Sequence, residues 1–315
     1  TCRMVPKVWW WILGAVLAGA VVVAVVLMTG SSSEVGAENE ATVDTDVRDR
    51  GSWTFMVYMI GDTDLEPFAL DDIAEMASVG STDDVNIVAL VDRSADYSTD
   101  SAVDLDDWED TVAFLVEKEH LQVVNQAGEL NMGDPATLAD FVADTAAQFP
   151  ADNYGLVLWD HGAGWPGMGP DETDDFDVLT LPEMDAGLTD GIERAGIDKL
   201  DMIGFDACLM STYEVASVMS SHADYMVASQ ELEPGHGWNY EELAVLTVDP
   251  EATTATDLGS AFIEGYALQA DAQGTGSDIT LAMLDLSKVG DVQAAVTDLA
   301  DAYEADPDGL GPVMA

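Results

Sequence analysis

Short apolar runs alternate with amphipathic segments along most of the chain from Trp53 onward. Runs such as Asn86–Val91 are apolar at nearly every position, which is typical of strands buried on both faces of a sheet. We predict strands over residues 53–60, 85–92, 111–116, 154–160, 199–205, 225–229 and 279–284. We predict helices over residues 65–78, 136–149, 181–195, 209–221, 240–246, 255–272 and 289–305. This alternation indicates one α/β domain with a mostly parallel sheet, spanning residues 52–315.

The N-terminal part departs from this pattern. Residues 8–28 form an uncharged apolar run after two basic residues, which is long enough to span a bilayer core of about 30 Å. We therefore expect a cytoplasmic stub over 1–7, a transmembrane anchor over 8–28 in the lipid bilayer, and a flexible stalk over 29–51, with the domain outside the cell. A cleaved signal peptide is the alternative, although its apolar core is normally about 7–15 residues. The sequence starts at Thr1 without a Met, as a fragment of a longer chain would.

The chain is strongly acidic. It carries 61 Asp and Glu against 9 Lys and Arg, a formal net charge of −52. Such a charge destabilises a compact state by self-repulsion unless salt screens it. Because 48% of the residues are hydrophobic, an acidic disordered chain is disfavoured, and we expect a protein of an extreme halophile. The phosphate backbone would be repelled, so we expect no nucleic-acid partner.

The predicted domain contains a single cysteine, Cys208, which closely follows the strand predicted over 199–205. We expect it at the turn into the helix predicted over 209–221, where unpaired backbone N–H groups lower the pKa of a thiol. His161 directly follows the strand predicted over 154–160. If the two strands are parallel neighbours, both side chains lie at the carboxyl edge of one sheet. A thiol and an imidazole there are the parts of a cysteine hydrolase, whereas a lone Cys or His is more often a packing residue.

Two further motifs suggest other ligands. Residues 162–167, Gly-Ala-Gly-Trp-Pro-Gly, match the dinucleotide fingerprint, but prolines and acids follow where that fingerprint opens a helix. We therefore expect no nucleotide cofactor. Calcium is a possible ligand of two groups of acidic side chains, one over residues 171–177 and one at Asp62, Asp64 and Glu66. Their spacing is not that of an EF-hand. For residues 171–177 we favour a solvated acidic loop, and for Asp62, Asp64 and Glu66 an acidic helix N-terminus. We therefore expect that no cofactor is required.

Five segments together resemble the clostripain-like cysteine peptidases, relatives of caspases and gingipains. They lie within residues 53–240 in the order found in that family. The segments are Trp53–Met59, Gly61–Glu66, Leu158–Trp165, Gly204–Met210 and Ser229–Tyr240. The His-Gly and Asp-Ala-Cys-Leu-Met runs are specific in combination and weak when taken singly.

The resemblance implies a caspase-like three-layer α/β/α sandwich and hydrolysis of peptide bonds in protein or peptide substrates. It implies a catalytic dyad of His161 and Cys208. It also implies that Asp206 favours Arg or Lys at P1, the residue before the scissile bond. A helix cap is the alternative role for Asp206. The N–H groups of Gly162 and Cys208 are candidate donors of an oxyanion hole.

The resemblance further implies that residues 229–240 line the substrate cleft, and we expect Ser229, Glu231 and Trp238 to bind substrate. His236 in this segment is an alternative base, but the strand-end position favours His161. Family members are often cut between the His and Cys segments, and some use calcium. The only basic residues between Gly162 and Cys208 are Arg194 and Lys199, so self-processing after a basic residue is expected to be absent or shifted.

Three functions stay open from the sequence. The leading hypothesis is a surface-anchored endopeptidase that cuts after Arg or Lys. A non-catalytic surface or binding domain is the second. A different acyl transfer on the same dyad is the third, because a fold does not fix a reaction.

Overall fold

The computed structural model describes residues 46–306. The predicted anchor over 8–28 and the predicted stalk up to residue 45 lie outside the described residues. Within the part that is described, no helix is both long and apolar enough to cross a membrane.

In the described residues, eight strands form one sheet in the order β10-β9-β8-β5-β1-β2-β3-β4. The five central strands from β9 to β2 are parallel, while β10, β3 and β4 run antiparallel to their neighbours. The bounds are β1 Gly51–Ile60, β2 Val85–Asp92, β3 Thr111–Glu117, β4 His120–Gly128, β5 Ala151–Trp159, β8 Leu200–Asp206, β9 Ala223–Ala228 and β10 Ala282–Asp285. The predicted mostly parallel sheet is thereby confirmed.

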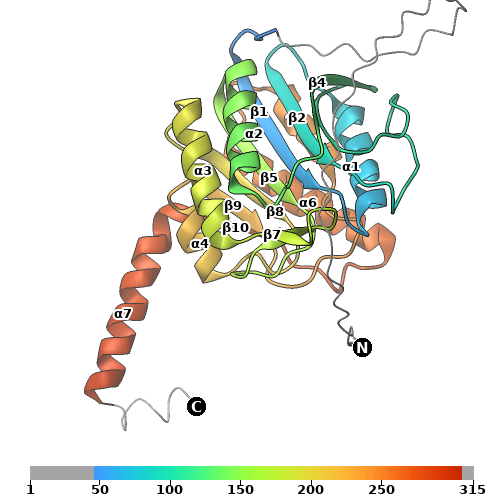
Figure 1. Cartoon of the computed structure of the whole chain (residues 1–315). Helices are drawn as coiled ribbons and strands as arrows, with labels where there is room; N and C mark the ends of the chain where they lie inside the picture. Colours follow the sequence, from blue (N-terminus) through green and yellow to red (C-terminus); the bar gives the residue numbers. More distant parts are fainter. Residues whose placement is uncertain (1–45, 307–315) are drawn as a thin grey trace, which may run out of the picture. The chain divides into compact units, whose positions relative to one another are not determined.

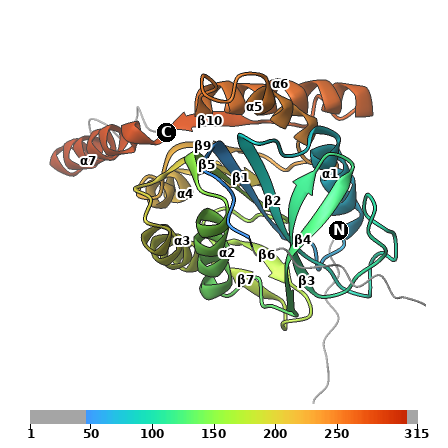
Figure 2. The same ribbon diagram turned by 90° about the horizontal axis from the view of Figure 1, so that it is seen from above.

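Helices cover both faces of this sheet (Figures 1 and 2). One face packs against α2 (Pro135–Gln148), α3 (Leu181–Ala195) and α4 (Tyr213–Met219). The other packs against α1 (Glu66–Val79), the 3-10 turn η1 (Tyr240–Leu243), α5 (Ala244–Val248) and α6 (Ala255–Gln273). The chain then runs through η2 (Leu286–Lys288) into α7 (Val289–Ala305), which buries none of its residues. The result is a three-layer α/β/α arrangement.

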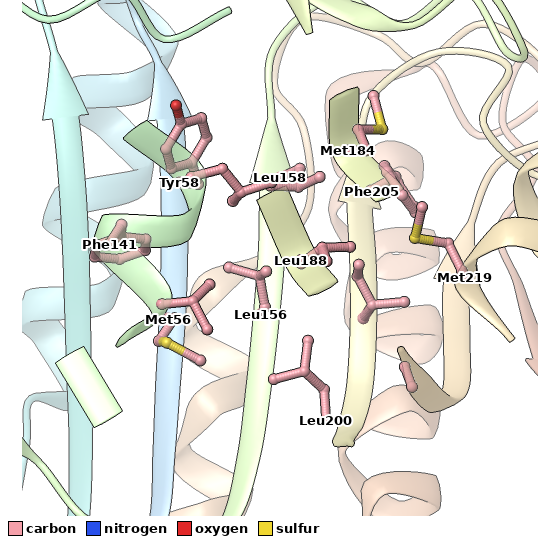
Figure 3. Close-up of a cluster of buried hydrophobic side chains, with 14 of the residues drawn as sticks. Met56, Tyr58, Phe141, Leu156, Leu158, Met184, Leu188, Leu200, Phe205 and Met219 are labelled. Carbon is pink, nitrogen blue, oxygen red and sulfur yellow. The ribbon is translucent and has the colours of Figure 1, made fainter. Parts of the chain in front are cut away.

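Strand β1 is the centre of the hydrophobic core, and all ten of its residues are buried. Successive side chains of a strand point to opposite faces, so Met56 and Tyr58 pack with Phe141 of α2, as Figure 3 shows. Phe55 points to the other face, where its ring lies 5.8 Å from that of Phe262 in α6. The Tyr58 hydroxyl donates to the carbonyl of Met132 at 2.8 Å, so its polar end is satisfied.

Local sequence signals explain where several helices begin. Asp134 accepts a hydrogen bond from the N–H of Ala136, and Pro135 occupies the first helical position of α2. Thr180 and Glu183 form a reciprocal capping box at the start of α3. These signals are local, and they place both helices within a residue or two of the sequence prediction.

Four elements differ from the sequence prediction. Helix α4 starts at Tyr213 rather than residue 209, because Thr212 supplies the N-cap. Strand β4 was not predicted, since the turn before it uses Glu119 at a φ of 58° instead of the Gly or Asn that marks a hairpin. The hairpin of β6 (Met168–Asp171) and β7 (Asp177–Leu179) occupies the stretch predicted to be a solvated loop.

Candidate active site

His161 and Cys208 come together because their strands are hydrogen-bonded neighbours. Strands β5 and β8 pair in parallel, with Trp159 opposite Asp206. Each candidate residue lies two positions beyond its member of that pair, at the carboxyl edge of the sheet. Both line one pocket of about 280 Å³. Its other lining residues are Leu65, Trp159, Asp160, Asp206, Ala207, Leu232, Glu233, Pro234, Gly235 and Gly237.

The backbones that carry these two residues approach each other closely. A Cβ atom built on Gly162 would lie 2.1 Å from the carbonyl oxygen of Cys208. Only glycine is accommodated there, so the residue after His161 sets how near the imidazole can come to the thiol. Within the described residues, neither the Gly162 N–H nor the Cys208 N–H donates to another protein group.

Cys208 lies in an irregular turn and not at a helix start, which corrects the sequence prediction. The next residue, Leu209, has a φ of 65°, a conformation that costs energy for a residue with a Cβ atom. Its N–H donates to the carbonyl of Glu231 at 3.0 Å, and the N–H of Ser211 donates to the carbonyl of Ser229 at 2.8 Å. Carbonyl groups of the segment after β9 therefore accept hydrogen bonds from backbone N–H groups that would have been unpaired at the start of a helix.

The thiol itself is held by that same segment. The N–H of Glu233 donates to the Cys208 Sγ across 3.2 Å, and the sulfur lies 3.8 Å from the Glu233 carbonyl oxygen. The N–H donor expected from the start of a helix is thus supplied by a loop.

His161 is fixed by two loops. Its Nε2 atom lies 2.8 Å from Oδ1 of Asp64, which follows β1. Its backbone carbonyl accepts the N–H of Gly169, in β6, at 2.9 Å. Both side chains of the ion pair are substantially exposed, at 47% for His161 and 73% for Asp64. The sequence grouped Asp64 with Asp62 and Glu66, but in the structure each of these acids has a different partner.

Asp206 lines the pocket and is only 4% exposed. Its Oδ2 accepts hydrogen bonds from the Trp238 N–H and the Tyr240 hydroxyl, each at 3.1 Å. The alternative role as a helix cap is therefore wrong, since Thr212 caps α4. Burial raises the pKa of Asp206 to about 6, against the lowering effect of its side-chain contact with Glu233 and of these two hydrogen bonds.

A second carboxyl group, Glu233, accompanies Asp206 and was not singled out from the sequence. Both of its carboxyl oxygens are buried without a hydrogen-bond partner among the described residues. Burial, and then the charge of Asp206, raise the pKa of Glu233 well above its usual range. Two acidic groups that share one site seldom ionise together, so this pair carries about one negative charge near neutral pH.

The segment over 229–240 supports the pocket in a different way from the one predicted. Ser229 and Trp238 are fully buried, so their predicted contact with substrate is wrong in this conformation. Ser229 bonds within the loop and to Thr280, and the Trp238 ring packs 5.1 Å from that of Phe262. Glu231 is exposed but does not line the pocket, and its role stays a prediction.

His236, the alternative base, does not line this pocket. Its two ring nitrogens lie 2.9 Å from the carbonyl oxygen of Gly237 and 2.9 Å from the hydroxyl of Thr275. Both nitrogens are therefore engaged in holding the loop, which favours His161 as the base.

A separate acidic cluster lies near the same edge of the sheet. Four carboxylates, from Asp62, Asp92, Glu129 and Asp171, place oxygen atoms within 4.8 Å of one another. Asp171 is fully buried, so the prediction that this acid belongs to a solvated loop is wrong. The donor set is the one that calcium prefers, and the residues fit such an ion.

Comparison with known proteins agrees with this arrangement. The sequence profile of the clostripain family matches residues 57–308. The chain belongs to the clostripain family. It is 30% identical over 298 residues to clostripain from Hathewaya histolytica, an alignment that covers 78% of this chain and 55% of that protein. The chain thus spans little more than half the length of this curated clostripain relative.

Solved structures of similar proteins share the fold seen here. A secreted C11 cysteine protease from Bacteroides thetaiotaomicron, bound to an irreversible peptide inhibitor, aligns with a TM-score of 0.63 and 23% identity, covering 80% of this chain and 71% of that one. An inactive zymogen C11 protease from Parabacteroides distasonis aligns with a TM-score of 0.60 and 21% identity, covering 79% and 66%. The clostripain-family chain therefore has the α/β fold of these proteases.

Proposed function

We propose that this clostripain-family chain is a cysteine endopeptidase that hydrolyses peptide bonds after Arg or Lys. Cys208 is the nucleophile and His161 the acid–base group. The observation that carries the basic preference is the pair of carboxyl groups, Asp206 and Glu233, which line the same pocket as Cys208. Among the described residues, no Lys or Arg forms an ion pair with either group. The side chain of a basic P1 residue would supply the missing positive charge.

The chemistry follows from the groups around the pocket. The Cys208 thiolate attacks the scissile carbonyl carbon, forming a C–S bond and an oxyanion. His161 protonates the leaving amine as the C–N bond breaks, and then takes a proton from the water that hydrolyses the thioester. The N–H groups of Gly162 and Cys208, which donate to no other group among the described residues, would stabilise the oxyanion.

Arginine should be preferred to lysine in this site. The planar guanidinium offers several donors in a fixed geometry and is less strongly hydrated than an ammonium group. Oδ2 of Asp206 already accepts two hydrogen bonds, so the proposed contact of the guanidinium is with the other carboxyl oxygen, Oδ1. We expect the guanidinium to bind there.

The cellular setting belongs to the same proposal and rests on the sequence. The apolar run over 8–28, with basic residues before it, supports an anchor in a lipid bilayer and a catalytic domain outside the cell. The acidic composition supports action in concentrated salt.

The test is an assay of the purified protein on fluorogenic peptides with Arg, Lys, Asn or Asp at P1, in concentrated NaCl. We expect hydrolysis of the Arg peptide first and the Lys peptide second. Cys208→Ala should abolish both hydrolysis and labelling by a thiol-reactive peptide. Equal cleavage of the Asn and Asp peptides would contradict the basic preference, and full activity of Cys208→Ala would contradict the mechanism.

A further inference from the structure

A second cavity, of about 530 Å³, is lined by residues of α1, η1 and α6. It shares no lining residue with the candidate active-site pocket. Four of its residues, Phe68, Asp71, Asp72 and Glu75, follow one another in α1 at spacings of one, three or four, so they lie on one side of that helix. The side of a helix that faces its neighbours is ordinarily apolar, but three of these four residues are acids.

Asp72 is buried in the wall of this cavity, with only 1% of its surface exposed. Its Oδ2 accepts the indole N–H of Trp159 at 2.7 Å. Its Oδ1 accepts no hydrogen bond from any residue that the structure describes. A buried carboxyl oxygen without a hydrogen bond costs free energy, so this atom points to a ligand.

Gln269 of α6 carries a second acceptor without a partner. Its Nε2 donates to Oε1 of Glu75 at 3.2 Å, while its own Oε1 is buried and unpaired within the described range 46–306. The amide cannot be turned round, because its oxygen would then face the Glu75 carboxylate. The other Glu75 oxygen, Oε2, accepts the backbone N–H of Tyr240 at 2.8 Å. The cavity therefore offers acceptors and needs a donor.

No basic side chain balances the acids of this cavity. Asp71 and Glu241 are exposed members of the lining, and Asp72 and Glu75 lie deeper. The lining contains no Lys or Arg, and in the described part of the chain none of these four acids forms an ion pair with one. His236 also lines the cavity, but both of its ring nitrogens are engaged by other groups.

We propose that this cavity binds a linear organic cation, an alkyl ammonium or an alkyl guanidinium, with Asp72, Glu75 and Gln269 as its acceptors. Both groups are positively charged, carry several N–H donors and have no acceptor. The exposed ring of Phe68 gives an apolar wall for the alkyl stem. A volume of about 530 Å³ suits a ligand of several heavy atoms rather than a bare metal ion.

The cavity adjoins the candidate active-site pocket along two glycines of that pocket. A Cβ atom built on Gly237 would lie 3.0 Å from Oδ2 of Asp206 and 3.3 Å from Oδ2 of Asp72, so both carboxyl groups flank this one residue. A Cβ atom built on Gly235 would lie 3.0 Å from the ring of Phe68. The two hollows are therefore separated by a single stretch of backbone.

Two sources supply a cation of this chemistry. One is the side chain of a second Arg or Lys in a peptide substrate, and this source rests on the proposed function. The other is a free polyamine, which does not depend on that function. In either case the cation would act on the active-site pocket through Tyr240, because its N–H donates to Glu75 and its hydroxyl donates to Asp206.

Protons offset part of the negative charge when the cavity is empty. Burial raises the pKa of Asp72, and the charges of Asp206, Glu75 and Asp71 raise it further. Burial also raises the pKa of Glu75 to about 7, with Glu241, Asp206 and Asp71 adding to the effect, despite the hydrogen bond from a backbone N–H. A bound cation would replace these protons, so its binding should strengthen as the pH rises from 6 to 8.

The experiment titrates the Cys208→Ala protein with 1,4-diaminobutane by calorimetry, so that catalysis plays no part. The titration is done at constant ionic strength in concentrated NaCl, which suppresses weak binding to surface acids. We expect saturable binding that is stronger at pH 8 than at pH 6. The neutral analogue 1,4-butanediol, of the same chain length, should not bind.

Variants assign the binding to this cavity. Glu75→Gln should weaken diamine binding by at least about 10-fold, because it deletes a charged acceptor. Asp71→Asn, at an exposed position of the lining, should weaken binding less, and it serves if Glu75→Gln does not fold. Asp206→Asn should retain the binding, since its side chain belongs to the other pocket. Asp83→Asn, which removes an equal charge from an exposed loop position, should bind as the parent does.

A kinetic comparison in the chain that retains Cys208 distinguishes the two sources. Peptides with Arg at P1 carry either a second Arg or an Ala at each neighbouring position in turn. If the substrate fills the cavity, one such Arg should raise kcat/KM at least about 5-fold over its Ala counterpart, and Glu75→Gln should remove that gain. Diamine binding without this gain would assign the cavity to a free polyamine.

Two results would overturn the proposal. One is the absence of saturable diamine binding together with no gain from a second Arg at any position. The other is diamine binding that is unchanged in folded Glu75→Gln and Asp71→Asn proteins but lost in Asp206→Asn, since the ligand would then lie in the active-site pocket. Diamine binding to a chain without peptidase activity would leave the cavity site standing and count against the proposed function alone.

Discussion

The Nε2 atom of His161 lies 2.8 Å from Oδ1 of Asp64, so the imidazole at the pocket is held by the loop that leaves the central strand. Because both side chains are largely exposed, the pair contributes orientation rather than much stability.

We predict that Asp64→Asn lowers kcat/KM on an Arg peptide by about 10-fold, since the amide retains a hydrogen bond but loses the charge that orients a protonated ring. The melting midpoint should stay within about 2 °C of the parent, as expected for an exposed pair. Asp83→Asn is the charge-matched control. An Asp64→Asn protein with unchanged kcat/KM would show that the contact is incidental.

The two histidines of the region should differ sharply. His161→Ala should lower the rate at least about 10²-fold, the usual scale for an acid–base group. His236→Ala should lower it far less, because that ring bonds to Gly237 and Thr275 and does not line the pocket. Steady-state kinetics on one Arg peptide would decide between them. The reverse order would mean that the base had been misassigned.

Asp206 should give the protein a pH-dependent affinity for basic substrates. Its pKa of about 6 means that the carboxylate is ionised above pH 6 and protonated below it. We expect KM for an Arg peptide to rise as the pH falls through 6, and Asp206→Asn to show a high KM without this step. A step that survives in Asp206→Asn would place the specificity elsewhere, with Glu231 as the next candidate.

The raised pKa of Asp206 also makes the stability of the fold depend on pH. Between the ordinary value of 3.8 and the folded value of about 6, the native state holds a proton that the unfolded chain has released. Stability therefore falls as the pH rises through this window and levels off above it. Asp206→Asn removes this slope while its amide oxygen can still accept from Trp238 and Tyr240. Chemical denaturation across pH 4 to 7 would test this, and a marked destabilisation of Asp206→Asn at pH 7 would contradict it.

Gly162 should tolerate no side chain. Gly162→Ala places a Cβ atom 2.1 Å from the Cys208 carbonyl oxygen, so the two loops must separate. We predict a loss of at least about 10²-fold in kcat with a folded sheet, because a displacement of about 1 Å at reacting groups has that cost. Gly290→Ala in α7, where nothing lies within 4 Å of the new Cβ, is the matched control. Full activity of Gly162→Ala would contradict the close approach.

Salt should control whether the domain folds. The formal charge of −52 is screened over about 10 Å at 0.1 M salt and about 3 Å at 1 M. We predict a melting midpoint that rises steadily between 0.1 and 3 M NaCl, with KCl acting similarly at equal concentration. Circular dichroism melts measure this directly. A midpoint independent of salt would contradict the expectation of a halophilic protein.

The strands that position the site were predictable because they are long apolar runs with sharp ends. His161 and Cys208 follow such runs, and the family motifs add their order. The pairing of β5 with β8 could not be derived from spacing alone, since non-consecutive strands meet only through the whole fold. Strand β4 was missed for a different reason, because it is a half-exposed edge strand whose turn lacks a glycine.

The contacts around the nucleophile were beyond sequence reasoning because their partners are distant. The groups that hold Asp206 come from Trp238 and Tyr240, more than thirty residues later. The sequence also does not indicate which acids are buried. Asp171 and Asp175 belong to the same acidic run, yet Asp171 is buried and Asp175 is exposed. Acidic composition suggested solvation throughout, and tertiary packing decided otherwise.

The side-by-side pairing of β5 and β8 also governs what a cut between them would do. The chain leaves one strand at Trp159 and enters the other at Leu200, and the backbones are joined along five register pairs. A protein nicked anywhere in this interval would keep its two pieces together as neighbouring strands of one sheet. Such a molecule would migrate as a single particle on gel filtration and separate into two bands only after denaturation.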